Sequence, residues 1–254
     1  MSPSLYPWLV IGGIILSAVV WTLLLRRDPS RSDPRLALIY FAGLVGALVG
    51  AKLVYLAAEG WLPLTDAAQG SQDFWRRLAT GKSILGALLG GYAAVEMAKR
   101  MTGYRQATGD LFAVAAPLGI ALGRVGCLLH GCCQGKVCEA AWYTIRDVNG
   151  TARWPAVPIE LGFNVIFFVF ALVSTRRGRL QVQLFHVYLM AYGVFRLAHE
   201  VARETPRALG HLSGYQVTAL AVFALGVVRY WQRARLNPTS PAAPSTAPAR
   251  PPGG

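Results

Sequence analysis

Residues 36–58 read LALIYFAGLVGALVGAKLVYLAA, and Lys52 is the one charged side chain in this run. About 20 mostly apolar residues are needed to cross the hydrocarbon core of a bilayer, so this stretch predicts a transmembrane helix. The whole chain agrees: 54% of its 254 residues are hydrophobic, 15% are charged, and the mean hydropathy is +0.40. In a typical soluble domain about a quarter of the residues are charged. The sequence therefore predicts an integral membrane protein.

Six further apolar segments surround this run. Together they predict helices at residues 5–25, 36–58, 83–98, 109–129, 158–174, 183–199 and 212–230. No basic residue precedes the first segment, which favours a retained helix over a cleaved signal peptide. We therefore expect an all-α integral membrane protein with about seven transmembrane helices, formed by residues 1–236. Residues 237–254 are rich in Pro, Ala and Ser and predict a disordered cytoplasmic tail.

Lysines and arginines concentrate at one end of the predicted bundle. The segments that follow the first, third, fifth and seventh helices hold more of them than the segments that follow the other helices. Because basic loops stay in the cytoplasm, the N-terminus is predicted outside and the C-terminus in the cytoplasm. The net charge of +13 is then a consequence of topology. The chain has no continuous basic face, so nucleic acid is not an expected partner.

Glycines recur at helical spacing within three of the apolar segments. They are Gly43, Gly46 and Gly50, then Gly86 and Gly90, then Gly119 and Gly123. Small residues let membrane helices approach closely, so these positions predict helix packing.

Two arginines fall inside apolar segments, where an ionisable group costs about 2.5–3.5 kcal/mol to insert. Arg124 lies in LGIALGRVGCLLHG and Arg196 in YLMAYGVFRLAHE. Glu200 follows Arg196 by four residues, so an ion pair along one helix face is one interpretation. The other is an anionic ligand, because the planar guanidinium binds phosphate through two hydrogen bonds. We favour a phospholipid head group as the ligand, because the apolar segments contain few acidic residues that could pair with the two arginines.

All four cysteines of the chain lie close together after the first of these arginines. They are Cys127, Cys132, Cys133 and Cys138, with His130 among them. One interpretation is a structural disulfide, such as Cys133 with Cys138, at an outer membrane face. A second is a Zn²⁺ or copper site with Cys and His ligands, and a third is a catalytic or redox thiol. No other cofactor is expected. Adjacent Cys132 and Cys133 are poorly placed to bond each other.

Three stretches carry a family pattern. They are Gly-Arg-Val-Gly at 123–126 with the glycines at 131 and 135, Trp-Pro-Ala-Val-Pro-Ile-Glu at 154–160, and Ala-Tyr-Gly-Val-Phe-Arg-Leu-Ala-His-Glu at 191–200. They resemble the bacterial phosphatidylglycerol–prolipoprotein diacylglyceryl transferases, over about residues 36–233. The resemblance implies a multi-pass transferase of the bacterial inner membrane that acts in lipoprotein biosynthesis. Its diacylglyceryl group would pass from phosphatidylglycerol to the lipobox cysteine thiol of a preprolipoprotein signal peptide, and glycerol phosphate would leave.

The resemblance implies site roles for Arg124, Arg196, Tyr192 and Glu200, and the sequence itself adds Gly123, Gly126, His130 and His199 as candidates. The lipid phosphate is expected at Arg124, Arg196, Gly123 and Gly126. The glycines let a helix end open and expose backbone N–H groups to an anion. The catalytic candidates are Tyr192, Glu200, His130 and His199.

The third-helix stretch that carries a histidine in the family reads Leu85-Gly86-Ala87 here. His130 or His199 would then activate the thiol, which must react as the thiolate. Two alternatives stay open. One is the same scaffold with redox or metal chemistry at residues 127–138, and the other is a non-enzymatic membrane protein that binds lipid or metal.

Overall fold

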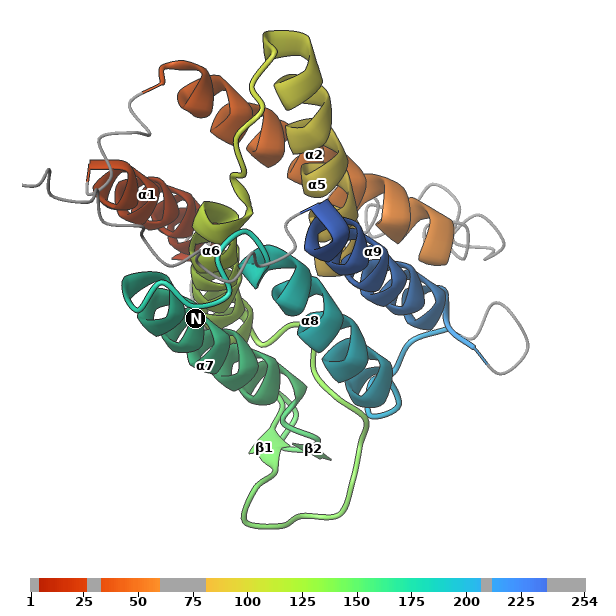
Figure 1. Cartoon of the computed structure of the whole chain (residues 1–254). Helices are drawn as coiled ribbons and strands as arrows, with labels where there is room; N and C mark the ends of the chain where they lie inside the picture. Colours follow the sequence, from red (N-terminus) through yellow and green to blue (C-terminus); the bar gives the residue numbers. More distant parts are fainter. Residues whose placement is uncertain (1–4, 27–32, 60–80, 207–211, 237–254) are drawn as a thin grey trace, which may run out of the picture.

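The computed structural model describes residues 5–26, 33–59, 81–206 and 212–236. Seven helices run through this part of the chain: α1 Leu5–Arg26, α2 Arg35–Ala58, α5 Ile84–Thr102, α6 Gly109–His130, α7 Ala156–Arg176, α8 Leu184–Glu200 and α9 Gly214–Leu236 (Figure 1). Each overlaps one predicted segment, so the seven predicted helices are confirmed. The predicted tail at 237–254 lies outside the described residues.

One element departs from the all-α expectation. Strands β1 Ile145–Arg146 and β2 Ala152–Arg153 pair antiparallel in a hairpin between α6 and α7. The hairpin projects beyond the bundle, next to the start of α7 (Figure 1). Asp147 stabilises its turn by accepting hydrogen bonds from the Asn149 and Thr151 amides, each at 2.9 Å.

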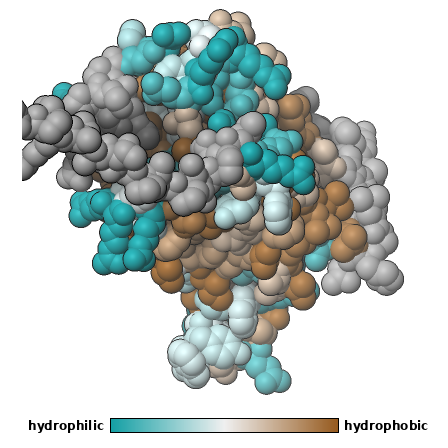
Figure 2. All heavy atoms as spheres, in the orientation of Figure 1, coloured by the Kyte–Doolittle hydropathy of each residue, from teal (hydrophilic) through white to brown (hydrophobic). Residues whose placement is uncertain are grey.

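The surface of the bundle is apolar enough for a membrane. Helices α2, α6 and α7 have the length and hydropathy to cross one. Large apolar side chains point outward on α2, where Leu38, Phe41 and Leu53 are each more than half exposed. Hydrophobic residues gather across the middle of the face shown in Figure 2. Soluble monomers rarely expose such patches, so the structure is that of a helical membrane protein.

Helices α2 and α5 touch backbone to backbone. A Cβ atom added to Gly46 would lie 2.5 Å from the Gly90 carbonyl oxygen, and one added to Gly50 would lie 2.3 Å from the Gly86 oxygen. No side chain fits in this contact, so the predicted packing role of these four glycines is confirmed. Gly123 differs, because a Cβ atom there meets nothing within 4 Å.

Hydrogen bonds show that the helices alternate in direction. At one end of the bundle, Arg35 of α2 donates to the Thr102 carbonyl of α5 at 3.0 Å. At the same end, Asp110 of α6 accepts from the Val182 amide just before α8 at 2.7 Å. The end of α6, the start of α7 and the end of α8 therefore meet at the opposite end.

Candidate functional site

Glu160 lies at the centre of a charged cluster where α6, α7 and α8 meet. Its side chain is fully buried, and its Oε2 is 2.6 Å from Arg124 Nη2 and 3.4 Å from Arg196 Nη1. The two guanidiniums come from α6 and α8, so one carboxylate of α7 joins three helices. Sequence reasoning missed this role, although the signal was present as an acid in the first turns of an apolar helix.

A second acid completes the pairing. Glu200 Oε2 is 2.6 Å from Arg196 Nη2, so the two residues form the ion pair that was the less favoured of the two sequence interpretations. Arg203, just beyond the helix, brings a third guanidinium with its Nε 3.9 Å from the same oxygen. Three guanidiniums thus meet two carboxylates, and Glu59 at the end of α2 brings a further carboxylate near Arg203 and Glu200. We call Arg124, Glu160, Arg196, Glu200 and Arg203 the arginine cluster.

Buried hydroxyl and amide groups hold the central carboxylate in place. Tyr192 donates its hydroxyl to Glu160 Oε1 at 2.5 Å. One turn earlier on α8, Tyr188 donates to Asn164 Oδ1 at 2.8 Å, and Asn164 donates to the Glu160 carbonyl at 2.8 Å. All four side chains are 0% exposed. The carboxylate is therefore fixed in one orientation, and water does not compete for it.

Several buried polar atoms of the site have no hydrogen-bond partner among the described residues. They are Arg124 Nε, Arg196 Nε, Glu200 Oε1, both ring nitrogens of His199, and Arg203 Nε and Nη1. His199 is 7% exposed and stacks on Phe195, with 4.9 Å between ring centroids. Buried polar groups in native proteins are nearly always hydrogen-bonded. The cluster therefore has donor capacity left for a ligand with acceptor oxygens.

A cavity of about 240 Å³ adjoins the arginine cluster at this end of the bundle. Its lining is mostly polar and consists of Lys136, Glu200, Val201, Arg203, Glu204, Thr205, Ser213 and Gln216. Glu200 and Arg203 belong both to this wall and to the cluster. A polar group in the cavity can therefore reach the buried charges.

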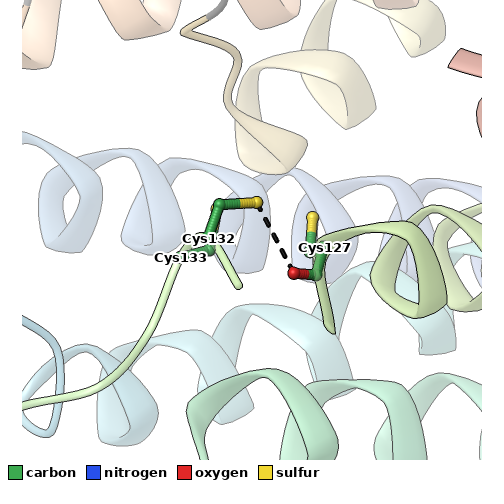
Figure 3. Close-up of side chains that lie close together, drawn as sticks. All are labelled: Cys127, Cys132 and Cys133. Atoms are coloured by element: carbon green, nitrogen blue, oxygen red, sulfur yellow. Dashed lines mark hydrogen bonds between the residues drawn. The ribbon is translucent and has the colours of Figure 1, made fainter. Parts of the chain in front are cut away.

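Three of the four cysteines meet beside the cluster. The Sγ atoms of Cys127, Cys132 and Cys133 all lie within 4.8 Å of one another (Figure 3). The predicted bond between Cys133 and Cys138 is not formed, and all four cysteines are free thiols. Cys138 instead lies next to the hairpin, where its amide donates to the Ala152 carbonyl at 3.1 Å.

The backbone after α6 explains why these sulfurs meet. Gly131 has a φ of 69°, the left-handed conformation that commonly ends a helix. The Gly131 amide then donates to the Leu128 carbonyl, and the Cys132 amide to the Cys127 carbonyl at 3.1 Å. Cys133 also has a positive φ, 60°, which turns the chain a second time. Hydrogen bonds from the Cys127 and Cys132 thiols lower the pKa of the Cys133 thiol.

The remaining predicted positions lie around this centre. His130 is the last residue of α6 and is exposed, whereas His199 is buried near the arginine cluster. Gly126 is buried one turn from the end of α6. Lys52, the charged residue of the apolar stretch 36–58, donates to the Gly81 carbonyl at 3.4 Å and lies over the ring of Tyr55.

Fold and site together define a class: a helical membrane protein with a buried cluster of arginines and glutamates and a polar cavity beside it. The family model for prolipoprotein diacylglyceryl transferase matches residues 2–232. The chain therefore belongs to the prolipoprotein diacylglyceryl transferase family and is a transferase-like enzyme of that family.

Relatives that carry the name phosphatidylglycerol–prolipoprotein diacylglyceryl transferase are distant in sequence. The protein from Geobacter sulfurreducens is 28% identical over 86% of this chain and 85% of its own length. The protein from Clostridium tetani is 26% identical over 84% of this chain and 86% of its own length. The protein from Dehalococcoides mccartyi is 31% identical over 61% of this chain and 62% of its own length.

Proposed function

We propose that this protein transfers a diacylglyceryl group from phosphatidylglycerol to the thiol of a prolipoprotein lipobox cysteine. The observation that carries the proposal is the arginine cluster, with its unpaired buried N–H groups. The oxygens of a phospholipid phosphodiester are hydrogen-bond acceptors that these N–H groups can bind. Family membership supports the same chemistry.

The reaction needs charge stabilisation at the phosphate. The acceptor thiolate attacks the carbon of the diacylglyceryl group that bears the phosphate, a C–S bond forms, and the bond from that carbon to the phosphate oxygen breaks. The electron pair leaves with glycerol phosphate. Preorganised guanidiniums of Arg124 and Arg196 would stabilise that developing charge, because a buried site strengthens their electrostatic effect.

Four further residues would help to position the lipid. Tyr192 and Glu200 hold the guanidinium groups in position, directly or through Glu160. His199 is placed to hydrogen-bond the head group, because its ring nitrogens are unpaired in the described structure. Gly123 leaves open space on α6, and the helix there can accept a ligand.

The proposed topology brings this site to the outer face of the inner membrane. Seven transmembrane helices with the N-terminus outside place the ends of α6 and α8 on that face. The opposite end of the bundle carries the more basic segments, including Arg100, Arg176 and Arg233, as expected for a cytoplasmic side. A secreted precursor and outer-leaflet lipid would then meet at the cavity.

The test uses the full chain in phosphatidylglycerol vesicles with a lipobox peptide. We expect release of glycerol phosphate and a peptide mass gain of one diacylglyceryl group. Arg124→Ala and Arg196→Ala should each lower the rate by more than about 100-fold, as loss of one charge-stabilising group does elsewhere. Arg146→Ala, on the exposed hairpin, should keep the rate and serves as the matched control.

Two results would contradict the proposal. One is an inactive wild-type protein beside an active relative, and lipid binding without turnover would then favour the non-enzymatic alternative. The other is full activity in the Arg124→Ala variant.

A further inference from the structure

The three clustered thiols form a group with the donors of a metal site. Cys127, Cys132 and Cys133 each offer one sulfur, and the sulfurs lie within 4.8 Å of one another. In a tetrahedral zinc site with Zn–S bonds of about 2.3 Å, neighbouring sulfurs are about 3.8 Å apart. Binding would therefore need a contraction of at most about 1 Å. Side-chain rotation at a helix end can provide it.

The number of donors separates two kinds of zinc site. Structural sites have four protein ligands, whereas catalytic sites have three and keep one position for water or substrate. Here the group found in the described part of the chain has three members. Cys127 is buried, Cys132 is half-buried and Cys133 is exposed, so the cluster opens toward the surface on one side. An open fourth position would face that side.

The surrounding charge also suits an anionic metal–thiolate group. Arg124 Nη1 lies 3.8 Å from Cys127 Sγ and can donate to it. Zinc with three thiolates carries one negative charge, and the neighbouring Arg124 guanidinium would stabilise it. The same guanidinium touches the sulfur group and the carboxylate of Glu160, at 2.6 Å. The thiol group and the arginine cluster are thus adjacent parts of one site.

We propose that Cys127, Cys132 and Cys133 bind a zinc ion, and that the acceptor thiol occupies the fourth coordination position. The second half of this proposal rests on the proposed function. The acceptor thiol displaces the metal-bound water and loses its proton to solvent, because a coordinating thiol is deprotonated. The bound thiolate then attacks the glyceryl carbon, the C–O bond breaks, and glycerol phosphate leaves. Zinc stays in its oxidation state, so no oxidant or reductant is needed.

The first experiment measures metal binding without any substrate. The full chain is purified without chelator, and its metal content is determined before and after stripping and reloading with zinc alone. We expect about one zinc per chain in the wild-type protein. Cys132→Ser and Cys133→Ser should weaken zinc binding by more than about 100-fold, since even groups outside the ligand shell change affinity about 10–100-fold.

Cys138→Ser is the matched control and should bind zinc as the wild type does. Thermal unfolding of all variants establishes that they are folded. Three outcomes would overturn the zinc site: no bound zinc after reloading, copper in place of zinc in the purified protein, or unchanged zinc affinity in Cys133→Ser.

The second experiment tests the fourth position with cobalt as a visible substitute for zinc. Tetrahedral cobalt–thiolate sites have strong visible absorption that responds to a change of one ligand. A lipobox peptide with its cysteine should change this spectrum, and the same peptide with serine should not. Equal spectra with both peptides would overturn the thiol-binding step. If zinc binds and the spectrum responds while no lipid is transferred, the proposed function fails and the metal site stands.

Discussion

Replacing Glu160 by glutamine tests whether a buried carboxylate holds the bundle together at the site. At an effective dielectric constant of about 20, unit charges 2.6 Å and 3.4 Å apart attract by about 6 and about 5 kcal/mol. Most of this electrostatic attraction is offset by the free-energy cost of removing the charged groups from water. Removing one partner of a buried pair costs about 3–5 kcal/mol, because the other charge stays buried. The Glu160→Gln variant should therefore be about 3–5 kcal/mol less stable to unfolding than the wild type, because glutamine has nearly the same size and shape as glutamate but no charge.

The assay is thermal unfolding of the protein in phosphatidylcholine nanodiscs, followed by tryptophan fluorescence. For a chain of this size about 2–4 °C is lost per kcal/mol, so the Tm should fall by roughly 6–20 °C. Glu204→Gln is the control. Glu204 pairs with Arg153 at 3.2 Å but its side chain is 54% exposed, and such pairs contribute at most about 1 kcal/mol.

Lipid composition adds a second readout to the same measurement. With the carboxylate gone, the guanidiniums of Arg124 and Arg196 lack their shared partner, and a lipid phosphate can replace it. Phosphatidylglycerol should therefore raise the Tm of the Glu160→Gln variant more than that of the wild type. A fall no larger than that of Glu204→Gln would refute the buried, ionised carboxylate on which this reasoning depends.

Three further predictions use the same preparation. Gly90→Ala, whose Cβ would lie 2.3 Å from a carbonyl of α2, should destabilise the protein by about 1–3 kcal/mol; Gly162→Ala, with nothing within 4 Å, should stabilise it by about 0.5–1 kcal/mol. Tyr192→Phe removes a 2.5 Å hydrogen bond to the central carboxylate and should cost about 1–3 kcal/mol in unfolding; unchanged stability would contradict that role. The hydrogen bond from Arg153 lowers the pKa of Asp147 below 3.8. The ionised Asp147 carboxylate should therefore stabilise the hairpin at any pH above 3.8, and this stabilisation should disappear as the pH falls through the folded-state pKa. Amide exchange of the hairpin checks this, and loss of protection already between pH 7 and 5 would contradict it.

Hydropathy was sufficient to find the helices, because each buries or exposes a long apolar face. The hairpin escaped prediction, since its strands have two residues each and show no alternating pattern. Its turn depends on the side chain of Asp147, which bonds amides two and four residues later.

The candidate site was predicted in part. The burial of Arg124 and Arg196 follows from their position inside apolar segments, whereas the pairing of Arg196 with Glu200 was the less favoured of two interpretations. The contact between Glu160 and both arginines could not be derived, because it depends on how three helices pack. The meeting of Cys132 and Cys133 with Cys127 depends on a positive φ at a residue other than glycine, which the sequence does not indicate.

The glycine contact between α2 and α5 limits which amino-acid substitutions this protein can accept during evolution. Every amino-acid replacement at Gly50 or Gly90 adds at least one carbon, and what that carbon meets is the backbone of glycines on the opposing helix. A second mutation cannot relieve the overlap by trimming the partner, because the residues opposite are already the smallest available. Compensation would have to move a whole helix. This interface therefore accepts neither a single substitution of these glycines nor a compensating pair of substitutions.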